Sequence, residues 1–239
     1  MTRDEARSKI IFALDVDTLD SARHWVTTLA GRVGMFKVGK QLFTAYGPDI
    51  VRMIENNGVE VFLDLKYHDI PNTVAMASRE AARLQVKLFN LHALGGYDMM
   101  ARTMEMMERE FPAENRSKVL AVTILTSSTE ETLREVGIEH PVTEMVPRLA
   151  KLAQKAGIDG VVASPREVAL IREACGSDFL IVTPGVRPSF AASDDQKRIM
   201  TPAEAVAAGA DYLVIGRPIS AAADPLRAVE AIVDEIAAA

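Results

Sequence analysis

Cysteine and histidine are scarce in this chain. Its 239 residues include one cysteine, Cys175, and four histidines. A single thiol cannot form an internal disulfide, and no group of cysteines and histidines has the spacing of a structural zinc site. We therefore expect a fold that is held by neither a disulfide nor structural zinc.

Excess positive charge and long apolar runs are also missing. The formal net charge is −6, whereas a partner such as nucleic acid or an anionic membrane favours a basic surface. No apolar stretch approaches the roughly 20 residues of a membrane span, and the first residues, "MTRDEARSK", lack the apolar core of a signal peptide. We expect a cytoplasmic protein without a nucleic-acid or membrane partner. An anionic small substrate is still possible, but the positive charge that binds it would have to be concentrated at the binding site.

Short runs rich in β-forming residues alternate with helical patterns along the whole chain. The expected strands are 9–16, 35–39, 59–66, 88–93, 118–125, 160–164, 179–185 and 212–217. Several helices between them have start signals: Ser164 and Thr201 each precede Pro and a Glu at the third helical position, and Asp224 precedes Pro225. Each of these signals marks where a helix should begin.

Eight strands that alternate with helices predict an α/β protein of the (β/α)8 TIM-barrel class, with one domain over residues 1–239. The alternative is an open doubly wound sheet, which more often has a glycine-rich loop after its first strand. Here "ALDVDTLD" follows the first strand and contains no glycine.

Ionisable residues interrupt the ends of otherwise apolar strands. The stretch 59–74, "VEVFLDLKYHDIPNTV", places Asp64 and Lys66 at the end of the third strand and Asp69 just beyond it. Asp15 stands at the expected end of the first strand, and Lys37 lies within the second. Residues two apart share a strand face, so Asp64 and Lys66 should point together. Barrel enzymes build their active sites at these carboxyl ends, and alternating signs allow each charge a partner.

The seventh and eighth strands end in "TPGVRPS" and "VIGRP". Gly185 and Gly216 would expose backbone N–H groups, and Arg187 and Arg217 follow them closely. In this barrel class the loops after these two strands often bind phosphate, so the pattern predicts a phosphate clamp. The loop 187–200 is long for a connection of this kind and is expected to act as a lid.

His68 and His92, near the ends of the third and fourth strands, leave two interpretations open. They could bind a metal beside Asp64 or Asp69, or they could form structural hydrogen bonds. Lysines in the same cluster would repel a divalent cation, so we expect no metal.

With these residues assembled, the chain resembles the orotidine 5′-phosphate decarboxylase family. "FLDLKYHDIPNTV" is similar to the family's Asp-x-Lys-x-x-Asp-Ile-Pro-Asn-Thr signature, and "LDV", "FKVG", "LTS", "PGVR" and "IGRP" match further blocks in order. The resemblance covers essentially the whole chain. Which threonine of "TILTS" meets the ligand is open between Thr123 and Thr126, and we choose Thr126.

The resemblance implies that orotidylate loses CO2 to give uridylate, in pyrimidine biosynthesis and without a cofactor. Lys66 would protonate C6 of the pyrimidine, Asp64 would lie near the departing carboxylate, and Lys37 and Asp69 would hold the charged network. Asp69 and the residues after it would enter the site of a partner subunit in a homodimer. The implied substrate-binding residues are Asp15, Lys37, Asp64, Ile70, Thr73, Thr126, Pro184, Arg187, Gln196, Gly216 and Arg217.

Two other functions are compatible with these residues. A related barrel, a sugar-phosphate decarboxylase or aldolase, shares an Asp-x-Lys-x-x-Asp block and would usually want a divalent metal. A barrel that binds pyrimidine nucleotides without catalysis would have no need for a lysine that donates a proton.

Overall fold

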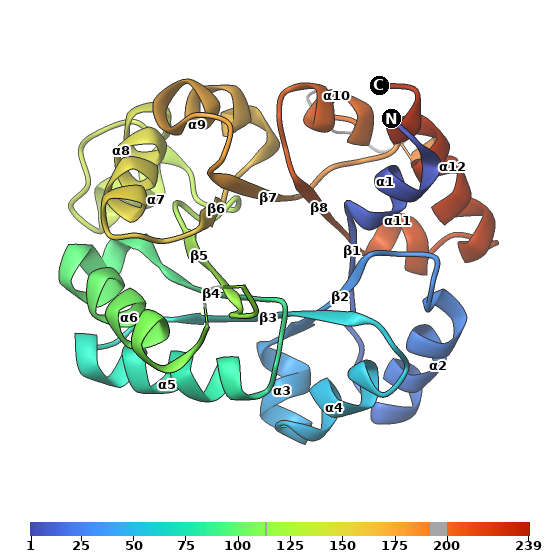
Figure 1. The fold of residues 1–239 in the computed structure, drawn as a ribbon. Helices are drawn as coiled ribbons and strands as arrows, with labels where there is room; N and C mark the ends of the chain where they lie inside the picture. The colour runs from blue at the N-terminus through green and yellow to red at the C-terminus, as the bar shows by residue number, and fades with distance from the viewer. Residues whose placement is uncertain (113, 192–199) are drawn as a thin grey trace. The chain divides into compact units, whose positions relative to one another are not determined.

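The computed structural model describes residues 1–112, 114–191 and 200–239. Its eight strands are all parallel where their pairing is defined, and they follow one another in a closed barrel in the order β1 to β8 (Figure 1). The strands are β1 (Ile10–Ala13), β2 (Met35–Gly39), β3 (Glu60–Tyr67), β4 (Leu88–His92), β5 (Lys118–Val122), β6 (Gly160–Val162), β7 (Leu180–Pro184) and β8 (Tyr212–Ile215). The prediction of a (β/α)8 barrel is confirmed.

Contacts along the chain define two compact units. The first unit combines residues 1–65 with 185–239, and the second contains residues 66–184. The prediction of a single domain over residues 1–239 stays a prediction.

The first unit contains β1, β2, β8 and most of β3. Its helices are α1 (Arg3–Ser8), α2 (Leu19–Leu29), α3 (Lys40–Tyr46), α4 (Asp49–Glu55), α10 (Pro202–Ala207), α11 (Arg217–Ser220) and α12 (Pro225–Ala237). Phe12 on β1 is paired in register with Phe36 on β2, and the two buried rings meet edge to face at 5.9 Å. Trp25 of α2 packs on Phe12 at 5.3 Å between ring centroids. This aromatic group joins a helix to the strands that carry Lys37 and, just beyond β1, Asp15.

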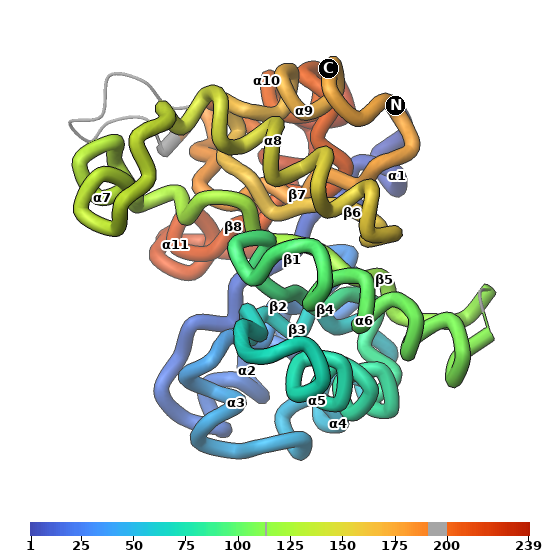
Figure 2. The backbone as a smooth tube through the Cα atoms, turned by 90° about the vertical axis from the view of Figure 1, so that its left-hand side faces the viewer, coloured from blue at the N-terminus to red at the C-terminus, as the bar shows by residue number. Residues whose placement is uncertain are grey.

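The two ends of the chain belong to this first unit and lie side by side (Figures 1 and 2). The N-terminal ammonium donates a hydrogen bond to the carbonyl of Ala237 at 3.3 Å, and α1 packs against α12. The apolar face of α12, with Val229, Ile232 and Val233 fully buried, explains why this last helix docks.

The second unit contains β4 to β7, which pair in sequence order. Its helices are α5 (Pro71–Arg83), α6 (Gly96–Glu110), α7 (Glu130–Glu135), α8 (Val142–Lys155) and α9 (Val168–Cys175). α5 and α6 pack side by side, as Figures 1 and 2 both show. α6 directs five buried methionines inward, and unbranched methionine side chains fill irregular space between helices well.

The helix starts that the sequence predicts are confirmed in detail at two places. Thr201 Oγ1 accepts from the Glu204 N–H at 3.2 Å, and a Glu204 carboxylate oxygen accepts from the Thr201 N–H at 2.8 Å. Asp224 Oδ1 accepts from the Arg227 N–H at 3.0 Å at the start of α12. At Ser164 the start signal opens a single 3₁₀ turn, Pro165–Glu167, that leads into α9.

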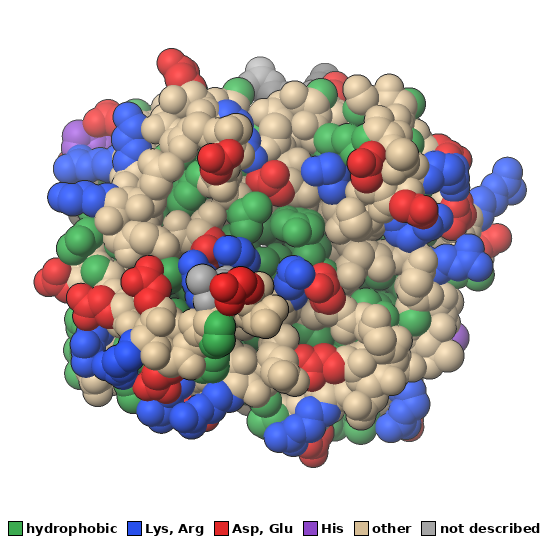
Figure 3. Space-filling view, viewed as in Figure 1, with side chains coloured by type: hydrophobic (Ala, Val, Ile, Leu, Met, Phe, Trp, Pro, Cys, Tyr) green, Lys and Arg blue, Asp and Glu red, His purple; other side chains and the backbone are tan. Residues whose placement is uncertain are grey.

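Charged side chains of both signs cover the surface. In the view of Figure 3 acidic and basic side chains are interspersed, and many pair within one helix, such as Arg52 with Asp49 at 2.9 Å. Within the part of the chain that the structure describes, no helix is both long and apolar enough to cross a membrane.

One group of charges in the second unit is mostly buried. Asp159, just before β6, accepts from both terminal nitrogens of Arg116 at 2.6 and 2.8 Å, and from the backbone N–H of Val119 at 2.8 Å. The two side chains are only 10% and 12% exposed. Hydrogen bonding to Asp159 raises the pKa of the Arg116 guanidinium, so the guanidinium stays charged. The carboxylate thereby ties the starts of β5 and β6 together.

Replacing Asp159 by alanine is expected to lower the free energy of unfolding by about 3 to 5 kcal/mol, because the Arg116 charge would be left buried without its partner. Urea titration with circular dichroism measures this loss. Asp49→Ala removes a solvent-exposed pair and is the matched control, with an expected loss of less than about 1 kcal/mol. Equal losses in the two variants would contradict a structural role for Asp159.

Candidate active site

Three of the predicted charges form a chain of ion pairs in the first unit. The Lys37 Nζ lies 3.1 Å from Asp15 Oδ1 and 3.5 Å from Asp64 Oδ2. Lys37 and Asp64 side chains are only 11% and 12% exposed, whereas that of Asp15 is 68% exposed. Burying an ammonium group is costly unless it is paired, and Lys37 has two carboxylate partners at the carboxyl ends of the strands.

Asp15 does not lie where the sequence places it. The expected strand 9–16 includes Asp15 near its end, but β1 ends at Ala13, so Asp15 belongs to the following loop. The Leu14 N–H still donates to the Lys37 carbonyl at 3.1 Å, which continues the pairing for one residue. A residue beyond the strand is not bound to strand alternation, and this freedom lets Asp15 turn toward Lys37.

Gly39, at the end of β2, has no side chain, and this leaves room for the Lys37 ammonium. A Cβ atom at residue 39 would stand 3.3 Å from Lys37 Nζ and 3.8 Å from Asp15 Oδ1. The glycine of "FKVG" is therefore explained by close approach of the charged groups to the backbone.

The predicted phosphate clamp also belongs to the first unit. Gly185 has φ +85°, a conformation that side chains with a Cβ avoid. The Arg187 N–H donates to the Met200 carbonyl at 3.1 Å, which joins the two ends of the 187–200 loop. Gly216 adjoins the charged chain, because a Cβ there would lie 4.0 Å from Asp15 Oδ2. Arg217 is exposed at the start of α11.

Gln196 and the central part of the predicted lid, residues 192–199, lie outside the described residues. The role of this loop stays a prediction.

Lys66, the first residue of the second unit, has an unusual backbone. Its φ of +53° is left-handed, although it is counted within β3. Its N–H donates to Asn90 Oδ1 on β4 at 2.8 Å. The expectation that Asp64 and Lys66 share a face rests on regular strand alternation, which a left-handed residue interrupts. Nothing in the residue pattern signals this conformation, because lysine rarely adopts it.

The neighbouring Tyr67 cannot act as a base in this segment. Its ring packs on Phe89 with the centroids 6.4 Å apart. Burial raises the pKa of the Tyr67 hydroxyl to about 12, so the phenol stays neutral at physiological pH.

The segment after β3 turns outward. The Ile70 N–H donates to Asp69 Oδ1 at 2.6 Å, and Ile70 has the extended backbone, φ −59° and ψ 151°, that a following proline favours. Pro71 is the first residue of α5. Asp69, Ile70 and Thr73 are all exposed, and Ile70 is 68% exposed although it is apolar.

The two candidate threonines differ in the structure. Thr123 is fully buried, and its hydroxyl donates to the Val162 carbonyl at 3.2 Å. Thr126 is exposed beyond β5, so its hydroxyl is accessible to a ligand. Pro184 ends β7 and is partly buried.

His68 and His92 lie against each other, with ring centroids 5.5 Å apart. Among the residues that the structure describes, no three histidine, cysteine or acidic side chains are grouped as a metal site would require. The expected absence of a metal stays a prediction.

These observations define a class of protein: a (β/α)8 barrel that carries a buried lysine paired with two carboxylates at the carboxyl ends of its strands, where enzymes of this fold build their sites. The model of the Orotidine 5'-phosphate decarboxylase / HUMPS family matches residues 8–232. The chain belongs to this family.

Curated relatives agree with that assignment over the full length. The chain is 74% identical to the orotidine 5'-phosphate decarboxylases of Geobacter sulfurreducens and Geotalea daltonii, over 238 residues and 100% of each chain. Among solved structures it is similar to the orotidine 5'-phosphate decarboxylase of Lactobacillus acidophilus, with a TM-score of 0.84, 39% identity, and coverage of 95% of this chain and 98% of the other. The resemblance seen in the sequence motifs is thereby confirmed.

Proposed function

We propose that the chain carries out its decarboxylation of orotidine 5′-phosphate to uridine 5′-phosphate with Lys66 as the proton donor. One observation carries the proposal: Lys37 joins Asp15 and Asp64 at the strand ends, and Lys66 follows Asp64 two positions later. Such a set supplies charge and one transferable proton without a nucleophile.

The chemical step balances with these groups alone. The bond between C6 and the carboxylate breaks, CO2 leaves, and the electron pair stays on C6. The Lys66 ammonium donates its proton to C6 and becomes a neutral amine, which solvent reprotonates before the next turnover. Asp64 lies near the departing carboxylate, and the positive charge of Lys66 stabilises the developing carbanion. We propose that no metal and no cofactor take part.

Substrate binding is divided between the remaining residues. Asp15 and Lys37 hold the ribose hydroxyls in this proposal. Arg187 and Arg217, with the Gly216 backbone and Gln196, bind the phosphate, and energy from that remote contact helps to orient the reacting group. Thr126 and Pro184 complete the ligand contacts. The exposed Thr126 hydroxyl supports its choice over the buried Thr123.

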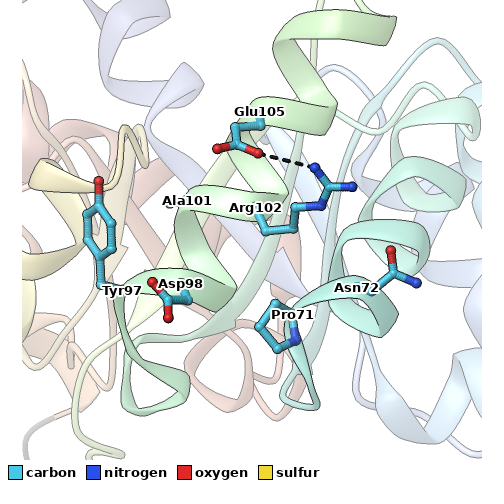
Figure 4. Close-up of a pocket in the computed structure, with 7 residues that line it drawn as sticks. All are labelled: Pro71, Asn72, Tyr97, Asp98, Ala101, Arg102 and Glu105. Atoms are coloured by element: carbon cyan, nitrogen blue, oxygen red, sulfur yellow. Dashed lines mark hydrogen bonds and ion pairs between the residues drawn. The ribbon is translucent and has the colours of Figure 1, made fainter.

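A homodimer completes the proposed site. Asp69 and Ile70 are exposed just beyond β3 and Thr73 is exposed in the first turn of α5, and the 68% exposed Ile70 offers an apolar contact to a second copy. An open groove begins at the same turn, where Pro71 and Asn72 of α5 face the first turns of α6 (Figure 4). Its lining residues are Pro71, Asn72, Tyr97, Asp98, Ala101, Arg102 and Glu105.

The residues that line the groove are of types that are common in protein–protein interfaces. Tyr97 is 41% exposed, and Arg102 forms an ion pair with Glu105 at 3.2 Å on the same helix. Tyrosine and arginine are enriched where protein surfaces bind. We propose that a second copy of the chain covers this surface and that its site receives Asp69. We also propose that the enzyme is cytoplasmic.

Two competing functions make different predictions for one assay. The protein is incubated with orotidine 5′-phosphate and a chelator, and loss of the orotate absorbance is followed. We expect full turnover, because the proposed chemistry uses protein charges alone. Turnover that requires added divalent metal would favour the sugar-phosphate decarboxylase or aldolase. Ligand that binds and stays unchanged would favour a non-catalytic nucleotide-binding barrel.

A further inference from the structure

The backbone of Lys66 is held in a conformation that a lysine does not choose. A φ of +53° brings the Cβ of any L-residue close to its own backbone. Within the described residues, Gln85 is the other non-glycine residue with a positive φ, and it follows the end of α5, where a left-handed residue is common. Lys66 instead lies at the end of a barrel strand. Such a residue persists when its surroundings hold it, and strained residues cluster at functional sites.

Asn90 is hydrogen-bonded to this backbone. Its Oδ1 accepts the Lys66 N–H at 2.8 Å, and its side chain is fully buried in the middle of β4. The other residues of the run "LFNL" are apolar and buried. A buried amide weakens a strand unless its polar atoms are bonded, so this asparagine has a specific task rather than a packing one.

The hydrogen bond runs from the backbone N–H of Lys66 to a side-chain oxygen of Asn90, and this arrangement explains the role of Asn90. Regular pairing would give the Lys66 N–H a backbone carbonyl on a neighbouring strand. A side-chain acceptor replaces that carbonyl here and allows the backbone of Lys66 to rotate away from extended geometry. The rotation sets the direction in which the Lys66 side chain leaves the strand.

We infer that Asn90 is a positioning residue for the reaction: it fixes the left-handed backbone of Lys66 and thereby aims the ammonium that donates the proton. The inference rests on the proposed role of Lys66. Asn90 acts through the Lys66 N–H and does not need to touch the substrate.

Two variants of similar size test the hydrogen bond. Asn90→Leu fills the same space but has no acceptor, and Asn90→Asp keeps an oxygen that can accept the Lys66 N–H. Ser117→Ala is the matched control, because Ser117 is also a buried polar side chain bonded to the backbone: its hydroxyl donates to the Val86 carbonyl at 2.5 Å. It lies just before β5, at the opposite end of the strands from the predicted site.

The variants are compared in the full-length protein by kcat, by the affinity for uridine 5′-phosphate and by the free energy of unfolding. Misaiming a reacting group by about 1 Å costs about 100-fold in rate, so Asn90→Leu should lower kcat about 100-fold. Nucleotide affinity should change less than about threefold, because the phosphate and ribose contacts are intact. Asn90→Asp should recover at least about tenfold of the lost kcat. Ser117→Ala should lose stability and keep its kcat.

A kcat of Asn90→Leu within about twofold of wild type, with the protein folded, would overturn the inference. The inference would also be overturned if Asn90→Asp lost as much kcat as Asn90→Leu. It would be overturned likewise if Ser117→Ala lost as much kcat as Asn90→Leu at an equal loss of stability. If Asn90→Leu does not fold, the smaller Asn90→Ala takes its place with the same expected results. Lys66→Ala separates this inference from the proposed function: near-normal turnover in Lys66→Ala rejects the proton donor itself, whereas an inactive Lys66→Ala with a fully active Asn90→Leu rejects the role of Asn90 alone.

Discussion

Replacing Lys66 by alanine is expected to abolish turnover while nucleotide binding remains measurable. The variant lacks both the transferable proton and the positive charge next to C6. General acid catalysis and electrostatic stabilisation each contribute about 100-fold or more, so a fall in kcat beyond about 10,000-fold is expected. Turnover is followed by loss of the orotate absorbance, and binding of uridine 5′-phosphate is measured by calorimetry.

Arg217→Ala is the matched control, because it removes a positive charge from the proposed phosphate clamp and leaves the proton donor in place. Its main effect should be a higher KM, with a smaller fall in kcat from the lost clamp. Near-normal turnover in Lys66→Ala would show that another group delivers the proton. Loss of nucleotide binding in Lys66→Ala, with unchanged stability, would point to a binding role instead.

Mixing two inactive variants, Lys66→Ala and Asp69→Ala, is expected to restore activity. The exposed Asp69–Ile70 turn leads away from β3, and in the proposed dimer it completes the site of the partner subunit. A two-fold axis makes this exchange mutual. In each mixed dimer one site therefore collects both substitutions, and the other collects neither.

The expected size of the recovery follows from random exchange. Half of the dimers become mixed, and each contains one site of wild-type composition, so about a quarter of all sites regain activity. Differently tagged chains allow the mixed dimers to be counted. Confirmed exchange without recovery would mean that Asp69 acts within its own subunit, and a protein that stays monomeric at assay concentration would remove the basis of the proposal.

The sequence predicts the fold of this chain well because the signals are local and repeated. Each β-rich run overlaps one of the eight strands, and Thr201 and Asp224 begin helices by the hydrogen bonds that their side chains predict. The predicted ends of the strands are less accurate. Asp15 was expected within the first strand because hydrophobicity continues through Leu14, but it lies in the loop beyond β1.

The sequence likewise predicts some residues of the candidate site and misses others. Lys37, Asp64 and Asp15 are recognisable because charges are costly at the ends of apolar strands, and they prove to be ion-paired at 3.1 and 3.5 Å. Asn90 was missed. A single asparagine in "LFNLH" shows its importance only when its partner is known, and that partner is a backbone N–H 24 residues earlier in the chain.

The sequence by itself determined the alternation of strands and helices, the family and the set of charged residues, because each depends on residue types and their order. Tertiary structure alone decided that Lys37 lies between two carboxylates, that Thr123 is buried while Thr126 is exposed, and that Lys66 has a left-handed backbone. The physical reason is that these features depend on distances between segments far apart in the chain. A hydrogen bond such as that from Lys66 to Asn90 forms only after folding brings both strands together, and it then selects a backbone conformation that the local sequence disfavours.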